Sequence, residues 1–165
     1  MTTFFNLERI INRMSEIVGK ASSFLIPICG GILFFEVIAR YVFAHPPLWT
    51  HDISQFAFGA SYLLGAAFVL LERKHVNMDI VYNRCSAKTK VYLNIFSGVV
   101  FLIFSGVIVW KGGFIAYESV KYKELFTQSV MEPPLYPMKI IFFIGCFLFM
   151  LQGISNLLND IRSSK

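Results

Sequence analysis

The sequence predicts an all-α integral membrane protein with four transmembrane helices, amphipathic interfacial helices, and both termini on the cytoplasmic side. Three observations support this prediction. The 165 residues are 56% apolar, with a mean hydropathy of +0.61, whereas soluble domains are about 45–50% apolar. Long runs without a charged residue recur, and Lys and Arg gather in the segments at one end of those runs. We expect a single membrane domain over residues 1–165.

Three charge-free runs have the length of a membrane span. Residues 53–71, 91–110 and 140–159 form runs of 19, 20 and 20 residues, and a bilayer core needs about 20 apolar residues in a helix. A fourth run, residues 21–35, continues apolar to Ala44 apart from two charges. Helices satisfy their own backbone groups in lipid, and the alternation typical of a barrel is absent. We predict transmembrane helices at about 21–43, 52–71, 91–111 and 138–158.

The segments that flank these spans are amphipathic. In residues 4–20 the apolar side chains recur at spacings of three and four, which predicts a helix lying on the inner leaflet. Pro27 is expected to kink the first span. Residues 78–86 suggest a second, short interfacial turn. Residues 114–130 predict that the third helix extends beyond the membrane, where the pair Gly112-Gly113 offers a place to bend.

Lys and Arg are distributed unequally about the predicted spans. Ten lie in the N-terminal segment, the connection between the second and third spans and the C-terminal tail, against four in the last connection between spans. Because cytoplasmic segments carry the excess of positive charge, both termini are predicted to be cytoplasmic. The net charge of +5 therefore indicates topology and attraction to phospholipid, and does not point to nucleic acid.

The histidines and cysteines do not form a pattern typical of a metal, haem or disulfide site. His45 and His51 precede the second span and His75 follows it, so a membrane thickness of about 30 Å separates them. Cysteines occur at positions 29, 85 and 146, which suits packing and not a disulfide framework. We therefore expect no metal, no cofactor and no enzymatic activity.

Glu36 and Arg40 are the only charges inside a predicted span. They are four residues apart with Glu first, which is the favourable order for a helical ion pair. Three interpretations stay open: a self-neutralised pair, a contact with another helix or subunit, and a proton-coupling carboxylate in a small four-helix exporter. The scarcity of interior polar groups favours an accessory subunit over an enzyme or a transporter acting alone.

The string ERKHVNMD, residues 72–79, follows the second span directly. Arg73 and Lys74 mark its cytoplasmic end. His75 and Asp79 could touch across one helical turn, but no third ligand accompanies them. We interpret His75 and Asp79 as a structural turn, in which Asp79 caps the next short helix.

Several strings in order carry a family resemblance. ARYVFAHPPLWTHD, LLGAAFVLLERKHVNMD and EPPLYPMK resemble the small membrane subunit of tripartite ATP-independent periplasmic (TRAP) transporters, the DctQ-like family. The matching positions are Arg40, Tyr41, Phe43, Pro46, Trp49, Leu64, Gly65, Ala66, Ala67, His75, Val76, Met78 and Asp79. One departure is the pair His51-Asp52, where the family has two acidic residues.

The resemblance implies a non-catalytic subunit of the bacterial inner membrane. Its partners would be a large elevator-type membrane subunit and a periplasmic solute-binding protein, in Na⁺-coupled uptake of a small organic acid. EPPLYPMK resembles systems for keto acids more than those for sialic acid. We expect contacts with the large subunit at Glu36, Arg40, Gly65 and Ala66, because small residues let helices approach closely. We expect docking of the binding protein at Trp49, His51, Asp52, Lys121 and Lys123.

Overall fold

The computed structural model describes residues 2–45, 47–72, 87–129 and 131–163, and five helices account for most of them. These are α1 (Thr2–Ser23), α2 (Leu25–Tyr41), α3 (Trp49–Leu71), α5 (Ala87–Lys121) and α6 (Tyr136–Ser163). Four stretches in this part of the chain are long and apolar enough to cross a membrane: Glu8–Tyr41, Trp49–Leu71, Tyr92–Lys121 and Tyr136–Ile161. The predicted all-helical fold with four spans is confirmed.

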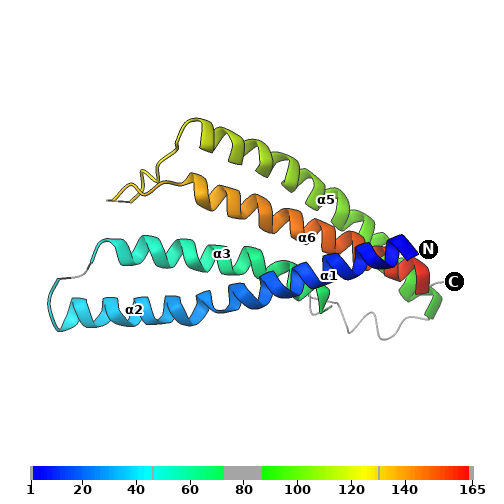
Figure 1. Cartoon of the computed structure of the whole chain (residues 1–165), viewed down its shortest axis with the longest axis horizontal. Helices are drawn as coiled ribbons and strands as arrows, with labels where there is room; N and C mark the ends of the chain where they lie inside the picture. The colour runs from blue at the N-terminus through cyan, green and yellow to red at the C-terminus, as the bar shows by residue number, and fades with distance from the viewer. Residues whose placement is uncertain (1, 46, 73–86, 130, 164–165) are drawn as a thin grey trace.

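The helices form two antiparallel hairpins that diverge from a common end (Figure 1). One hairpin is α2 with α3, and the other is α5 with α6. At the end where both termini lie, α3 packs against α6 and α1 crosses both of them. At the opposite end, which we call the splayed end, the helices of the two hairpins diverge, while the α5–α6 connection reaches the start of α3. The connections α2–α3 and α5–α6 lie there.

The first span is interrupted at Phe24, between α1 and α2. Pro27 lies in the first turn of α2, where its missing N–H costs no helical hydrogen bond and its ring disfavours continuation from the preceding turn. The Phe24 N–H instead bonds the Ala21 carbonyl at 3.3 Å, as in a turn. The interruption predicted from Pro27 is thus present, three residues before the proline.

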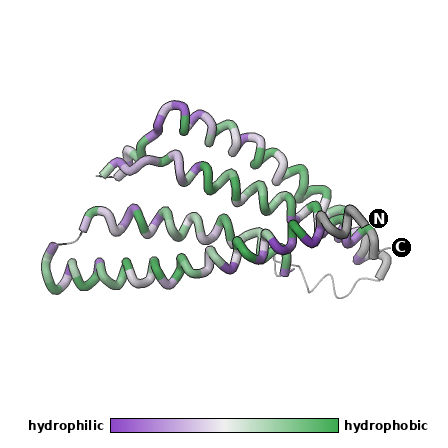
Figure 2. Tube along the Cα trace, in the orientation of Figure 1, coloured by the Kyte–Doolittle hydropathy of each residue, from purple (hydrophilic) through white to green (hydrophobic). Residues whose placement is uncertain are grey.

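The helix predicted over residues 4–20 is present as α1, and small polar side chains form part of its face against the bundle. Ser15 and Ser22 are buried against the bundle, whereas Ile10 and Ile17 are more than half exposed. Figure 2 shows hydrophobic residues along the lengths of the other helices and hydrophilic residues concentrated on α1 and at helix ends. A face that would be hidden from water can face outward in lipid, so the apolar pattern alone did not identify the packed face. The location of α1 on the inner leaflet stays a prediction.

Two close crossings fix the packing of the helices. A Cβ atom added to Gly145 of α6 would lie 2.9 Å from the carbonyl oxygen of Leu63 on α3. A Cβ atom added to Gly19 of α1 would lie 2.3 Å from the Cβ atom of Phe68. Glycine at these two positions therefore allows the helix backbones to approach, which is how helices associate in lipid.

The third helix extends beyond residue 111, toward the α5–α6 connection, as the sequence predicts. α5 continues past residue 111 to Lys121 without interruption at Gly112 and Gly113. Added Cβ atoms there would lie 3.0 Å from the rings of Phe142 and Phe143 respectively, so both glycines face α6. The helix stops short of the predicted residue 130, because Lys123 takes a positive φ of 48° that helices do not continue through.

Candidate functional site

An open hollow of about 460 Å³ lies at the splayed end, between α2, the start of α3 and the α5–α6 connection. It brings together two groups of residues that the sequence assigned to different partners. The polar and charged side chains that line it are Glu36, Arg40, His51, Asp52, Gln55, Gln128 and Ser129.

Glu36 and Arg40 form the α2 wall of this hollow. Arg40 Nη2 donates a hydrogen bond of 2.5 Å to Glu36 Oε1, one helical turn away. The Glu36 side chain is 15% exposed and that of Arg40 is 56% exposed. The geometry is that of the self-neutralised helical pair, one of the three interpretations that the sequence left open.

Asp52 lies in the first turn of α3 and is almost fully buried, at 5% exposure. Its Oδ2 atom accepts a hydrogen bond from Ser129 Oγ, which belongs to the α5–α6 connection. Phe126 of the same connection packs its ring 5.9 Å from that of Phe56 on α3. The connection is therefore tied to α3 by one polar and one aromatic contact. A carboxylate near the start of a helix is also stabilised by the helix dipole.

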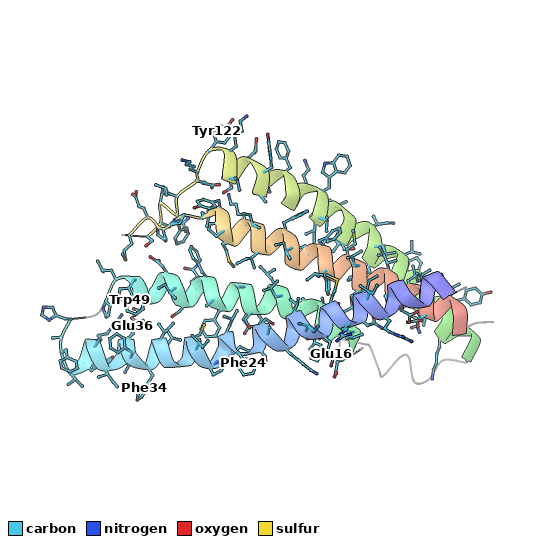
Figure 3. All side chains as sticks on the ribbon, in the orientation of Figure 1. Glu16, Phe24, Phe34, Glu36, Trp49 and Tyr122 are labelled. Atoms are coloured by element: carbon cyan, nitrogen blue, oxygen red, sulfur yellow. The ribbon has the colours of Figure 1, made fainter. Side chains whose placement is uncertain are left out.

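Trp49 and His51 flank Asp52 on α3. The Trp49 ring stacks on Phe35 of α2, with centroids 6.3 Å apart, and so joins the two helices at the splayed end. Thr50 Oγ1 donates to the Pro47 carbonyl at 2.8 Å, which fixes the entry into α3. His51 is exposed at the hollow. Figure 3 shows Trp49 and Glu36 close together at this end of the hairpin.

Lys121 and Lys123 lie apart from the hollow. Both are exposed at the end of α5, and Lys121 Nζ lies 5.4 Å from the centre of the Tyr122 ring. Figure 3 places Tyr122 at the tip of the other hairpin, away from Trp49. The five residues predicted to dock a binding protein are thus divided between two places.

A second ionic contact holds the base of the α5–α6 connection. Lys139 Nζ on α6 donates to Glu124 Oε2, and the hydrogen bond to this ammonium group holds the pKa of the Glu124 carboxyl below its ordinary value. The Glu124 N–H also bonds the Ser119 carbonyl at 3.0 Å. Sequence reasoning missed this pair, because nothing in the spacing of 15 residues indicates that the chain turns back there.

Gly65 and Ala66 lie in the middle of α3, far along the helix from Asp52. A Cβ atom added to Gly65 would meet Ser22 Oγ of α1 at 3.7 Å. The contact that the structure shows for Gly65 is therefore within the chain. Their predicted contact with a large subunit stays a prediction.

A buried polar cluster at the common end was also missed. Gln152 on α6, fully buried, accepts a 2.8 Å hydrogen bond from Ser15 and donates to Asn12 at 3.0 Å and Asn156 at 3.2 Å. Asn156 in turn donates to the Leu70 carbonyl of α3 at 2.9 Å. The cluster joins three helices. Its signal in the sequence is the spacing of Gln152 and Asn156, which places two amides on one helix face.

Within the described residues there is no group of three or more His, Cys, Asp or Glu side chains that could hold a metal ion. The predicted structural turn at His75 and Asp79, and the interfacial turn at residues 78–86, lie outside those residues. The cysteines described, Cys29 and Cys146, are free thiols.

The fold and the site define a multi-pass helical membrane protein. A family model, "Tripartite ATP-independent periplasmic transporters, DctQ component", matches residues 29–163. The chain therefore belongs to the DctQ component family of TRAP transporters, as its sequence strings suggested.

Two curated relatives are similar to parts of the chain. The sialic acid TRAP transporter small permease protein SiaQ of Vibrio cholerae is 24% identical over 106 residues, which cover 64% of this chain and 60% of the relative. The sialic acid TRAP transporter permease protein SiaT of Haemophilus influenzae is 28% identical over 88 residues, covering 53% of this chain and 14% of the relative. The alignments thus span less than two thirds of either relative.

Proposed function

We propose that this chain scaffolds a large elevator-type membrane subunit and contributes to docking of a periplasmic solute-binding protein, in Na⁺-coupled uptake of a small organic acid. The observation that carries the proposal is the family match over residues 29–163, together with the four-span fold. We assign the solute path to the partner, and the buried amide of Gln152 is already engaged within this bundle by Ser15 and Asn12.

The outward faces of the two hairpins support a scaffolding role. Phe34 on α2 is 68% exposed and Trp110 on α5 is 80% exposed, within helices that are apolar enough to span a membrane. Such faces need lipid or other helices around them. The permease from Haemophilus influenzae, in which the matching segment is 14% of a longer chain, supports association with a larger permease part.

We propose that the chain lies in a bacterial inner membrane with its splayed end on the periplasmic side. It rests on the ten-to-four bias of Lys and Arg, which favours cytoplasmic termini. The hollow would then face the compartment of a solute-binding protein. Both curated relatives are named for sialic acid, which is itself an organic acid, and we propose the solute only as a member of that broad class.

The alternative, a proton-coupled exporter that uses Glu36, has less support. Glu36 is engaged by Arg40 at 2.5 Å, so its carboxylate already has an ionic partner one helical turn away. Uptake into proteoliposomes tests the main proposal. Solute should enter when this chain, a large TRAP membrane subunit and a binding protein are present, and should fail when this chain alone is omitted. Equal uptake without the chain would contradict it.

A further inference from the structure

We propose that the hollow at the splayed end receives one basic side chain, Arg or Lys, of the soluble solute-binding protein, with Asp52 as its counter-ion. The inference rests on the proposed function and deepens it. It assigns Glu36 and Arg40 to the wall of the same docking site, and it separates Lys121 and Lys123 from that site.

The charges around the hollow are not balanced. Glu36 already has a cation, since Arg40 bonds it directly. Asp52 is 5% exposed, and within the described residues its side chain accepts a hydrogen bond from one group, the neutral Ser129 hydroxyl. Burying a carboxylate without a cation is costly, and a paired cation offsets that cost. Among the described residues that line the hollow, the negative charge of Asp52 therefore has no salt-bridge partner.

The shape of the hollow suits a long basic side chain. It is open to the outside and encloses about 460 Å³. Leu48 and Phe126 line it beside the polar groups, so an entering methylene stem would lie against apolar surface while its charged head reached Asp52. Gln128 contributes an amide to the same lining. Its oxygen can accept hydrogen bonds from those N–H groups of the entering basic side chain that Asp52 does not bond.

The position of the hollow favours a soluble partner over the large membrane subunit. Its walls are the end of α2, the first turns of α3 and the α5–α6 connection. It therefore opens at the end of the bundle and not along the apolar sides of the helices. A membrane subunit packs along those sides, whereas a soluble protein can only approach the end.

Binding of the solute-binding protein to the complete membrane complex in nanodiscs tests this inference. Asp52→Asn removes the charge, keeps the volume, and still accepts the hydrogen bond from Ser129. We expect it to raise the Kd about tenfold or more, as loss of a buried interfacial charge does, and to reduce the dependence of Kd on salt. Glu118→Gln, which removes an exposed carboxylate of α5 outside the hollow, should leave the Kd unchanged.

A second variant keeps Asp52 intact in case Asp52→Asn does not fold. Gln128→Cys, labelled with a photoactivated cross-linker, should capture the solute-binding protein through a segment that contains Arg or Lys. Glu118→Cys, labelled in the same way, should form no cross-link.

Two results would overturn the inference, and a third would contradict the proposed function on which it rests. An Asp52→Asn complex that binds with unchanged Kd and salt dependence would overturn it. So would an Asp52→Asn chain that no longer associates with the large subunit but still binds the solute-binding protein normally. The cation that pairs with Asp52 would then come from the membrane partner. A wild-type chain that never co-purifies with a large subunit would contradict the proposed function itself.

Discussion

Ser15 on α1 donates a 2.8 Å hydrogen bond to Gln152 on α6, although the two residues lie 137 positions apart in the chain. Gln152 is fully buried and also bonds Asn12, so its amide joins α1 and α6 through two contacts. In lipid there is little hydrophobic drive to hold one helix against another, and interhelical hydrogen bonds contribute to association. This cluster is therefore expected to hold α1 against the bundle.

Gln152→Ala should lower the free energy of unfolding by about 1–3 kcal/mol, because it leaves the buried Ser15 hydroxyl without its acceptor and removes one hydrogen bond to Asn12. Gln128→Ala, at an exposed position of the α5–α6 connection, should change it by less than about 0.5 kcal/mol. Unfolding in mixed detergent micelles measures both. Equal effects of the two variants would contradict a stabilising role for the cluster.

The charge-free runs predicted the four spans, because a membrane helix must exclude charge over its whole length. The role of α1 was harder to predict. Its apolar residues follow a helical period, but in lipid an apolar face can point outward, and Ile10 and Ile17 do so. Which polar residues meet inside, such as Ser15 and Gln152, depends on contacts between distant segments that a local pattern does not contain.

Gly145→Ala should destabilise the crossing of α3 and α6. The new methyl group would lie 2.9 Å from the Leu63 carbonyl oxygen, and backbone cannot move aside cheaply, so we expect a loss of about 1–3 kcal/mol. Gly106→Ala on α5 is the matched control, since a Cβ atom there has no neighbour within 4 Å. Thermal unfolding in detergent measures both; a Gly145→Ala protein as stable as Gly106→Ala would contradict the close crossing.

The ionic contact between Glu124 and Lys139 should make stability depend on pH. The pKa of the Glu124 carboxyl is lowered from 4.5 in the folded protein by its hydrogen bond to Lys139. The contact therefore contributes its full stability above pH 4.5, and this stability is lost as the pH falls through the lower pKa of the folded state. Wild type should therefore unfold at a higher temperature than Glu124→Gln at neutral pH, and the difference should vanish in acid. A difference that persists or grows in acid would contradict this account.

The site was only partly predictable for a related reason. Trp49, His51 and Asp52 are adjacent in sequence and follow one helix start, so their grouping was predicted. The sequence did not predict that Glu36 and Ser129 join this group, because their positions depend on how the α2–α3 hairpin and the α5–α6 connection meet. Lys121 and Lys123 lie at the tip of the other hairpin, and their predicted part in docking stays a prediction.

Glu36→Gln should leave coupled uptake largely intact when the solute-binding protein is saturating. The side chain keeps its size and can still accept a hydrogen bond from Arg40, and the ion pair it replaces is partly exposed. Solute uptake and assembly of the complex, measured together, check this expectation. Complete loss of uptake with normal assembly would favour a proton-handling carboxylate instead.

Co-purification tests the central claim most directly. The chain, tagged and extracted in mild detergent from its native membrane, should bring with it a larger multi-pass TRAP membrane subunit in a fixed ratio. Recovery of the chain alone, or only with copies of itself, under conditions that preserve other membrane complexes would contradict its assignment as a small scaffolding subunit.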